Sequence, residues 1–235
     1  MTILWRLLFG HFLADFALQS NFINDWKRSG TWGMLTHCGI HLGLYTLLCW
    51  PFLNDVWIDL GFVRLQGWTC MLLIFLLHYI EDIWRVFTIQ RHGVPDNTPY
   101  FLWDQTIHVV CIMAFVPTGL YEPTGMMPER WPVLGCLAVL VAHFGTVLLY
   151  FIEHDLFGGS YPDFDEKYLT MIERLGIAAC FLLPGFWGFA APAAWAGAAY
   201  AVREKGRLDY SWTGFYLGAI LAVVAGLAAR WVWYS

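Results

Sequence analysis

Long apolar blocks, separated by short polar loops, constrain the fold of this chain more than any other feature of its sequence. A helix that rises 1.5 Å per residue needs about 20 apolar residues to cross roughly 30 Å of hydrocarbon. The pattern predicts an all-α fold, a polytopic membrane bundle of about eight transmembrane helices. These apolar blocks lie at residues 3–22, 32–52, 66–89, 99–119, 132–153, 166–184, 186–203 and 212–233.

The composition excludes several classes of protein. Hydrophobic residues make up 59% of the 235 residues and charged residues only 13%, whereas a soluble domain has about 25% charged residues. A single soluble domain is therefore excluded. The 13 lysines and arginines are scattered along the chain, so the basic stripe of a nucleic-acid-binding protein is absent and no nucleic-acid partner is expected. The expected partner is the lipid bilayer, and a role beside other membrane subunits stays open.

The basic residues of the loops predict an orientation. Eight helices divide the loop lysines and arginines into a richer and a poorer side, and the positive-inside rule makes the richer side cytoplasmic. We therefore expect a multi-pass protein of the bacterial inner membrane with both termini outside. The richer side holds Lys27, Arg28, Arg85, Arg91, Lys167, Arg203, Lys205 and Arg207, and the poorer side holds Arg64, Arg130 and Arg230.

The chain is expected to form one integrated membrane domain with two unlike halves. Residues 1–120 carry nearly all of the polar residues that lie inside apolar blocks, and residues 121–235 form a supporting half of four helices. Pro184-Gly185 allows two interpretations, a turn between two helices or one helix with a proline kink. The six cysteines lie in apolar runs without a C-x-x-C motif, so they are interpreted as small core residues.

Pairs of polar residues recur on the first four predicted helices. Members of each pair are four residues apart, which places both side chains on one helical face, one turn apart. Four such helices can surround one point. The pairs are His11 with Asp15, His37 with His41, His78 with Asp82, and Asp104 with His108.

The depth of these eight residues is an independent indication. Counted along the alternating helices, all of them lie about 5–11 residues, or roughly 8–17 Å, from the cytoplasmic end. Unrelated polar residues would have no reason to share a layer in four antiparallel helices. The shared layer therefore predicts one site.

The residue types indicate a metal centre. Five histidines and three carboxylates suit zinc, iron or manganese, with zinc favoured, rather than copper(I) or an iron–sulfur cluster. Eight candidate ligands exceed the needs of one catalytic zinc, so two ions, or one ion beside a proton-handling pair, are expected. Asp15, Asp82 and Asp104 are candidate catalytic proton acceptors. Gln19, Glu81 and Gln105 are candidates to hydrogen-bond the ligands, and Glu81 is also a candidate general base.

A structural interpretation of the same residues stays open. Buried histidines and aspartates can pair across helices and serve only to hold them together. His143 has no partner four residues away and is interpreted as a packing residue. Glu173-Arg174 is either an ion pair that supports the site or an interfacial pair, and the run 203–207 reads as a solvated inner loop.

Several of these motifs, taken together, resemble a known family. The segment His11–Gln19 reads H-x-x-x-D-F-x-x-Q and resembles the opening signature of the bacterial membrane-protein family called domain of unknown function 3307. The later pairs resemble further motifs of that family, in its order. The second half is similar more loosely, through 173–175 and 210–218, and lacks a basic residue expected within 196–200. The resemblance implies a multi-pass membrane protein and no particular reaction.

The sequence leads to one expected function and two alternatives. We expect a metal-dependent hydrolase that acts on a lipid-like or membrane-borne substrate, because a metal with an open position lowers the pKa of bound water toward about 7. One alternative is a non-catalytic accessory subunit of a membrane complex, or a proton or ion pathway. Another is a di-iron redox enzyme, although the H-x-x-H-H boxes of membrane desaturases are absent.

Overall fold

The computed structural model describes residues 1–117, 129–205 and 211–235, and these residues are mainly helical. The chain divides into two compact units, Met1–Pro132 and Val133–Ser235. The predicted all-α class is therefore confirmed in its coarse form. The integration of the two halves into one domain stays a prediction. The end of the predicted helix 99–119 and the loop from Glu122 to Met127 lie partly or wholly outside the described residues.

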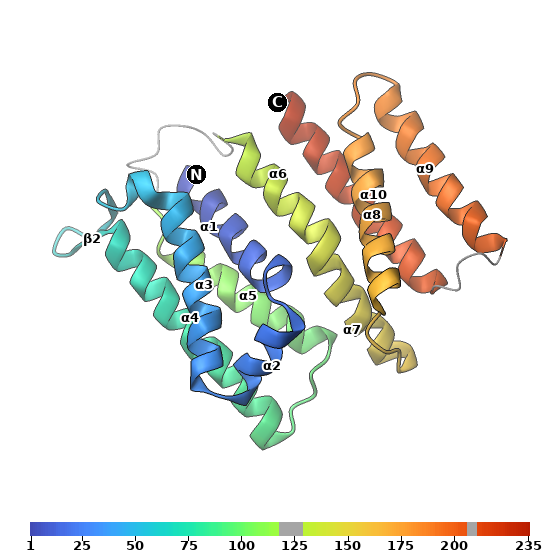
Figure 1. Cartoon of the computed structure of the whole chain (residues 1–235). Helices are drawn as coiled ribbons and strands as arrows, with labels where there is room; N and C mark the ends of the chain where they lie inside the picture. Colours follow the sequence, from blue (N-terminus) through green and yellow to red (C-terminus); the bar gives the residue numbers. More distant parts are fainter. Residues whose placement is uncertain (118–128, 206–210) are drawn as a thin grey trace. The chain divides into compact units, whose positions relative to one another are not determined.

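Four helices of the first unit form a closed ring (Figure 1). Each contacts two others, in the order α1, α3, α4, α5 and back to α1. A short helix, α2, packs on α3 at one end of the ring, and a two-stranded hairpin lies at the other end. The elements are α1 (Thr2–Phe12), α2 (Asn21–Ser29), α3 (Thr31–Cys49), β1 (Val56–Asp59), β2 (Arg64–Gln66), α4 (Gly67–His92) and α5 (Thr98–Ala114).

Local sequence explains where several of these helices begin and end. The Ser20 hydroxyl accepts a hydrogen bond from the backbone N–H of Ile23 and caps α2. Asn97 caps α5 in the same way, and Pro99 occupies its first turn. Helix α4 ends at His92 and is followed by Gly93, whose φ of 65° is a left-handed conformation that favours glycine.

Two parts of the first unit differ from the sequence prediction. The predicted helix 3–22 ends early, because α1 passes into a π-helical turn, η1 (Leu13–Ala17), and Ser20 then starts the separate helix α2. The connection between the predicted helices 32–52 and 66–89 contains the β1–β2 hairpin, for which no strand was predicted. Trp57 anchors that hairpin: its ring is buried, and its indole N–H donates to the carbonyl of Phe52 within the 3₁₀ turn η2 (Trp50–Phe52).

The second unit is built around α8. Helix α6 (Arg130–Val139) continues through a second π-helical turn, η3 (Leu140–Phe144), into α7 (Gly145–Phe157). Helix α8 (Phe164–Cys180) contacts η3, α7, α9 (Trp187–Glu204) and α10 (Trp212–Tyr234). The hydrophobic core of this unit contains the buried residues Val141, Ile177, Phe181, Ala222 and Ala225. Because α8 and α9 are separate, Pro184-Gly185 marks a turn between two helices.

Two helices, Arg130–Phe157 and Trp212–Tyr234, are long and apolar enough to cross a membrane among the described residues. Eight such spans are predicted from the sequence, but in the described part of the chain two helices meet the criteria of length and apolar composition. Helices α1, α5 and α8 have 11, 17 and 17 residues. Helix α4 has 26 residues, but His78, Glu81 and Asp82 lower its hydropathy. The polar residues that mark the candidate site therefore also weaken the signal of a membrane span.

Candidate metal centre

The eight histidines and aspartates predicted from the sequence come together in the first unit. Each is at most 8% exposed, although they come from four different helices. The i, i+4 spacing places both members of each pair on the face that its helix turns toward the others. Five imidazole rings consequently meet, with His41 and His78 centred 4.0 Å apart and His78 and His108 4.2 Å apart.

The first helix presents its pair through a local irregularity. Asp15 lies within the π-helical turn η1, which widens the helix by one residue. Such turns are common at functional sites because they redirect side chains. His11, in the last turn of α1, remains on the same side, with its Nε2 atom 3.5 Å from Oδ2 of Asp15.

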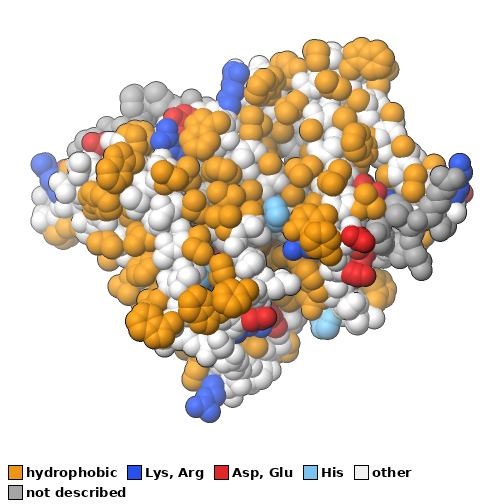
Figure 2. All heavy atoms as spheres, viewed as in Figure 1, with side chains coloured by type: hydrophobic (Ala, Val, Ile, Leu, Met, Phe, Trp, Pro, Cys, Tyr) orange, Lys and Arg blue, Asp and Glu red, His pale blue; other side chains and the backbone are white. Residues whose placement is uncertain are grey.

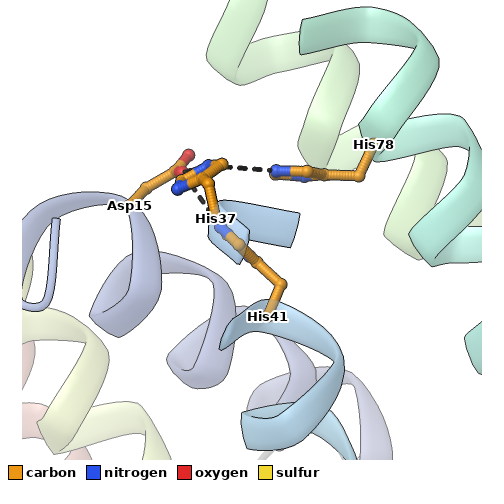
Figure 3. A group of neighbouring side chains, drawn as sticks. All are labelled: Asp15, His37, His41 and His78. Carbon is orange, nitrogen blue, oxygen red and sulfur yellow. Dashed lines mark hydrogen bonds and ion pairs between the residues drawn. The ribbon is translucent and has the colours of Figure 1, made fainter. Parts of the chain in front are cut away.

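Four residues form the largest of four overlapping ligand groups among the described residues, here called the three-histidine group: Asp15, His37, His41 and His78 (Figure 3). Their candidate ligand atoms lie within 4.8 Å of one another. Oδ1 of Asp15 is 3.1 Å from Nε2 of His41 and 3.2 Å from Nε2 of His37. The Nε2 atoms of His37 and His78 are 3.5 Å apart. Three imidazoles and a carboxylate are a ligand set that zinc accepts.

A smaller group, here called the two-aspartate group, consists of Asp82, Asp104 and His108 and shares no residue with the first. His108 Nε2 is 4.0 Å from Asp82 Oδ1, and His108 Nδ1 is 3.9 Å from Asp104 Oδ2. Asp82 also joins the two groups, because its Oδ2 atom is 3.3 Å from Nε2 of both His37 and His78. His11 lies between the groups, in a further set with Asp15 and His108.

Several polar atoms of the cluster are buried without a hydrogen bond. An unsatisfied buried polar group costs about 1–3 kcal/mol, and several together call for a ligand that the protein atoms do not supply. Metal ions accept lone pairs from imidazole nitrogens and carboxylate oxygens, so the residues fit a metal. The atoms are Nδ1 and Nε2 of His11, Nδ1 of His37, Oδ1 of Asp104, Oε1 of Gln105, and Nδ1 and Nε2 of His108.

Two cations that the sequence analysis placed only as topology markers belong to the site. Nζ of Lys27, on α2, is 2.6 Å from Oδ1 of Asp82. Arg85 donates to Oδ2 of Asp104 and to Oδ1 of Asp96, at 3.0 and 2.8 Å. The spacing of Arg85, one turn after Asp82, was an available signal. No periodicity could have revealed Lys27, because it lies on another helix.

The environment of Lys27 keeps it charged. Burial lowers the pKa of this ammonium group, but the negative charges of Asp82 and Asp15 outweigh burial and raise the pKa above its usual value. Asp15 itself contacts no lysine or arginine within the described part of the chain. Its neighbours there are His11, His37, His41 and the side-chain amide of Gln105.

Gly33 lets α2 approach closely enough for the Lys27 contact. A Cβ atom at Gly33 would lie 2.0 Å from the carbonyl oxygen of Trp26 and 2.7 Å from the backbone nitrogen of Lys27. Both distances are shorter than any van der Waals contact. Only a residue without a side chain therefore allows the backbone of α2 to rest on α3 at this point.

The structure separates the three candidate hydrogen-bonding residues. Gln105 donates from Nε2 to Asp15 at 3.2 Å and to Asp104 at 3.1 Å, so it joins the two groups. Gln19 contacts Asn24 instead. Glu81 is half-buried and forms no hydrogen bond or ion pair with the cluster in the ranges described. Cys38, expected only to pack, has its Sγ atom 3.9 Å from Asp82 Oδ2.

The notable polar residues of the second unit have structural contacts. His143 is half-buried in η3, outside the ligand groups. Glu173 and Arg174 do not pair with each other: Glu173 accepts two hydrogen bonds from Arg203, and Arg174 donates to the carbonyls of Val141 and Ala142. The prediction of a solvated Arg203 is wrong, because its pairing with Glu173 buries it to 4% exposure. Glu204 and Lys205 are exposed, as predicted, and 206–207 lie outside the described residues.

Comparison with known families identifies the first unit. A family model described as "Protein of unknown function (DUF3307)" matches residues 3–126, just over half of the chain. The chain belongs to the DUF3307 family. All eight residues of the cluster lie inside the matched segment, and the looser resemblance of 173–175 and 210–218 lies outside it. Comparisons with curated proteins and with solved structures found no match.

Proposed function

We propose that this DUF3307 protein is a metal-dependent hydrolase of the bacterial inner membrane, acting on a lipid-like or membrane-borne substrate. The observation that carries the proposal is that the overlapping ligand groups of the buried cluster include two with no residue in common, one of four residues and one of three. Zinc is favoured, since imidazole nitrogens predominate and the two groups contain no thiolate.

The two groups would have different tasks. Four protein ligands fill a tetrahedral ion, as in structural zinc sites, whereas three leave one position for water or substrate. We therefore assign the reaction to the two-aspartate group. A divalent metal there would supply Lewis acidity and would ease the ionisation of water.

Residues of the chain supply the other functions of the reaction. Asp104 has one oxygen, Oδ1, without a hydrogen bond, and this atom is our candidate proton acceptor. Lys27 holds Asp82 in place, and Arg85 holds Asp104, each through a direct ion pair. Gln105 donates hydrogen bonds to Asp15 and Asp104 and would fix the position of one ligand group relative to the other.

The surface of the first unit supports a multi-pass arrangement. Helix α4 turns His78 and Asp82 inward and exposes an apolar stripe, with residues three or four positions apart, each 41–55% exposed. An apolar outer face opposite a polar interior suits lipid contact. Hydrophobic side chains also cover much of the face in Figure 2, and charged ones are few. The stripe consists of Leu72, Leu76, Ile80, Ile83 and Phe87.

A second candidate function is a proton relay, or an accessory subunit held together by the same residues. It is favoured by the contacts of Lys27 and Arg85, which neutralise two of the three cluster carboxylates without any metal. The third carboxylate, Asp15, distinguishes the metal-dependent hydrolase from the relay or accessory role. Its charge needs either a metal ion or a protonated histidine.

Metal analysis of the purified protein tests the proposal. We expect detergent-purified protein to contain zinc, His78→Ala to lose most of it, and His143→Ala to retain it. Hydrolysis of lipid esters by the zinc-loaded protein, lost in His108→Ala, would support catalysis. Iron instead of zinc would favour redox chemistry, and the absence of any bound metal would favour the relay or accessory role.

A further inference from the structure

A surface pocket lies beside the two-aspartate group. It has a volume of about 40 Å³ and is lined by the α1–α2 connection, α2 and the end of α4. Two of its lining residues, Lys27 and Arg85, contact Asp82 and Asp104 directly. The side chain of Arg28 is 39% exposed and marks the outer side. The polar lining residues are Gln19, Asn24, Lys27, Arg28, Arg85 and Gln90.

The charges of this pocket depend on the metal centre. Three cations line it, and each of them pairs with a carboxylate: Asp82, Asp96 or Asp104. The charges therefore balance when the cluster holds no metal. A divalent ion bound by the two-aspartate group would add two positive charges next to Lys27 and Arg85. The loaded pocket would then carry an excess of positive charge, which an anion would compensate.

Two buried atoms of the pocket lining lack hydrogen bonds. Nε of Arg85 is an unused donor and Oε1 of Gln19 an unused acceptor. A tetrahedral oxyanion that keeps one hydroxyl group satisfies both, because its charged oxygens accept and its hydroxyl donates. The volume corresponds to about three water positions. This is room for a phosphate group and not for a whole headgroup.

Exposed aromatic residues lie near the pocket, on α2 and at the start of α3. Helix α2 exposes Phe22 and Trp26, and α3 begins with Trp32, exposed by 71%, 37% and 76%. Exposed aromatic rings beside lysine and arginine are typical of a helix in the headgroup layer of a membrane. A basic pocket at that level is suited to the phosphate of a lipid headgroup.

We propose that the pocket lined by Lys27, Arg28 and Arg85 binds a phosphate group and directs its ester toward the two-aspartate group. The inference rests on the proposed metal-dependent hydrolase and narrows its substrate class to phosphate esters. The phosphate belongs either to a lipid headgroup or to a small water-soluble molecule. The exposed aromatic residues beside the pocket favour the lipid.

Binding measurements on the detergent-solubilised full chain test the pocket. Three probes are titrated into zinc-loaded and chelator-treated protein: inorganic phosphate, short-chain phosphatidic acid, and diacylglycerol of the same chain length. The variant is Arg28→Ala, which changes the pocket without touching the ligand groups, and the matched control is Arg91→Ala. Arg91 is an exposed cation at the end of the same α4 and does not line the pocket.

We expect phosphate and phosphatidic acid to bind, diacylglycerol not to compete, and zinc to tighten binding by about fivefold or more. Arg28→Ala should weaken binding about tenfold, because it removes a charge-assisted hydrogen bond, and Arg91→Ala should leave it unchanged. Tighter binding of phosphatidic acid than of phosphate identifies a lipid headgroup, and equal binding identifies a small phosphate compound.

Two results would contradict different parts of the reasoning. Zinc uptake without phosphate binding, or phosphate binding that Arg28→Ala leaves unchanged, would overturn the pocket and leave the metal centre standing. Phosphate binding that requires Arg28 in a protein without bound metal would overturn the hydrolase and leave the pocket standing.

Discussion

Replacing Asp15 by asparagine should separate a metal centre from a purely structural cluster. Asp15 belongs to the three-histidine group and is the cluster carboxylate that contacts neither lysine nor arginine among the described residues. Asparagine keeps the shape of the side chain and removes its charge. On the metal hypothesis the variant loses one of four ligands and keeps the three histidines, so metal binding weakens while the fold persists.

The expected size of the effect follows from linkage. Metal present at 100 times its Kd stabilises the folded protein by about 2.7 kcal/mol, which corresponds to roughly 5–10 °C in Tm for a chain of this length. Loss of a direct ligand should weaken the affinity at least about 100-fold, since even outer hydrogen-bond partners cost 10–100-fold. The stabilisation by the same metal concentration then falls to about 0.4 kcal/mol, or roughly 1 °C.

The assay is thermal unfolding in detergent, with and without a chelator. The metal of the three-histidine group should account for about 5–10 °C of the fall in Tm on chelation in the wild type, and for about 1 °C in Asp15→Asn. Asp55→Asn, an exposed aspartate of the same unit, should behave as the wild type does. If Asp15→Asn does not fold, His41→Gln takes its place. A wild-type Tm that ignores the chelator, or an equal shift in wild type and variant, would refute the metal interpretation.

Three further predictions concern other parts of the molecule. Substituting any one histidine of the two ligand groups by alanine should lower the metal content measured by mass spectrometry, whereas His143→Ala should not, and equal content throughout would refute the grouping. Burial opposes ionisation of Asp96, but Arg85 and Arg28 outweigh it and hold its pKa below 3.8. The ion pair therefore stabilises fully above about pH 4 and weakens as pH falls through the lowered pKa. Asp96→Asn should thus cost about 1–2 kcal/mol at pH 7 and progressively less below pH 4 in unfolding titrations. Arg174→Met should lower the Tm strongly, because each carbonyl left without its donor in η3 costs about 1–3 kcal/mol, and an unchanged Tm would contradict that role.

Periodicity predicts the part of this structure that depends on helical geometry. Each of the eight apolar blocks corresponds to a helix in the described structure, and the i, i+4 pairs meet because 3.6 residues per turn fix their common direction. The convergence of His11 with residues nearly 100 positions away follows from four such directions within one ring. Helical ends were less predictable, since the π-helical turn at Leu13–Ala17 has no periodic signature.

Contacts between unlike elements could not be read from the sequence. Lys27 was counted as a loop charge because a nine-residue amphipathic helix has no apolar block to reveal it. Arg203, at the end of the apolar block 186–203, was assigned to solvent because its partner, Glu173, lies on a different helix; that pairing buries it. The assignment of four of the eight ligands to one group and three to the other, with His11 in neither, depends on side-chain positions to within a few ångströms, which spacing along a helix does not determine.

Gly33 shows how a residue without functional atoms can control the chemistry of the cluster. In α3 alone, alanine at this position would be harmless or even favourable, because alanine has the higher helix propensity. In the whole unit it would push the Trp26–Lys27 backbone outward and draw the ammonium group away from Asp82. Natural variation at this position should therefore be limited by the charge balance of a carboxylate on another helix, and not by the stability of the helix in which the glycine lies.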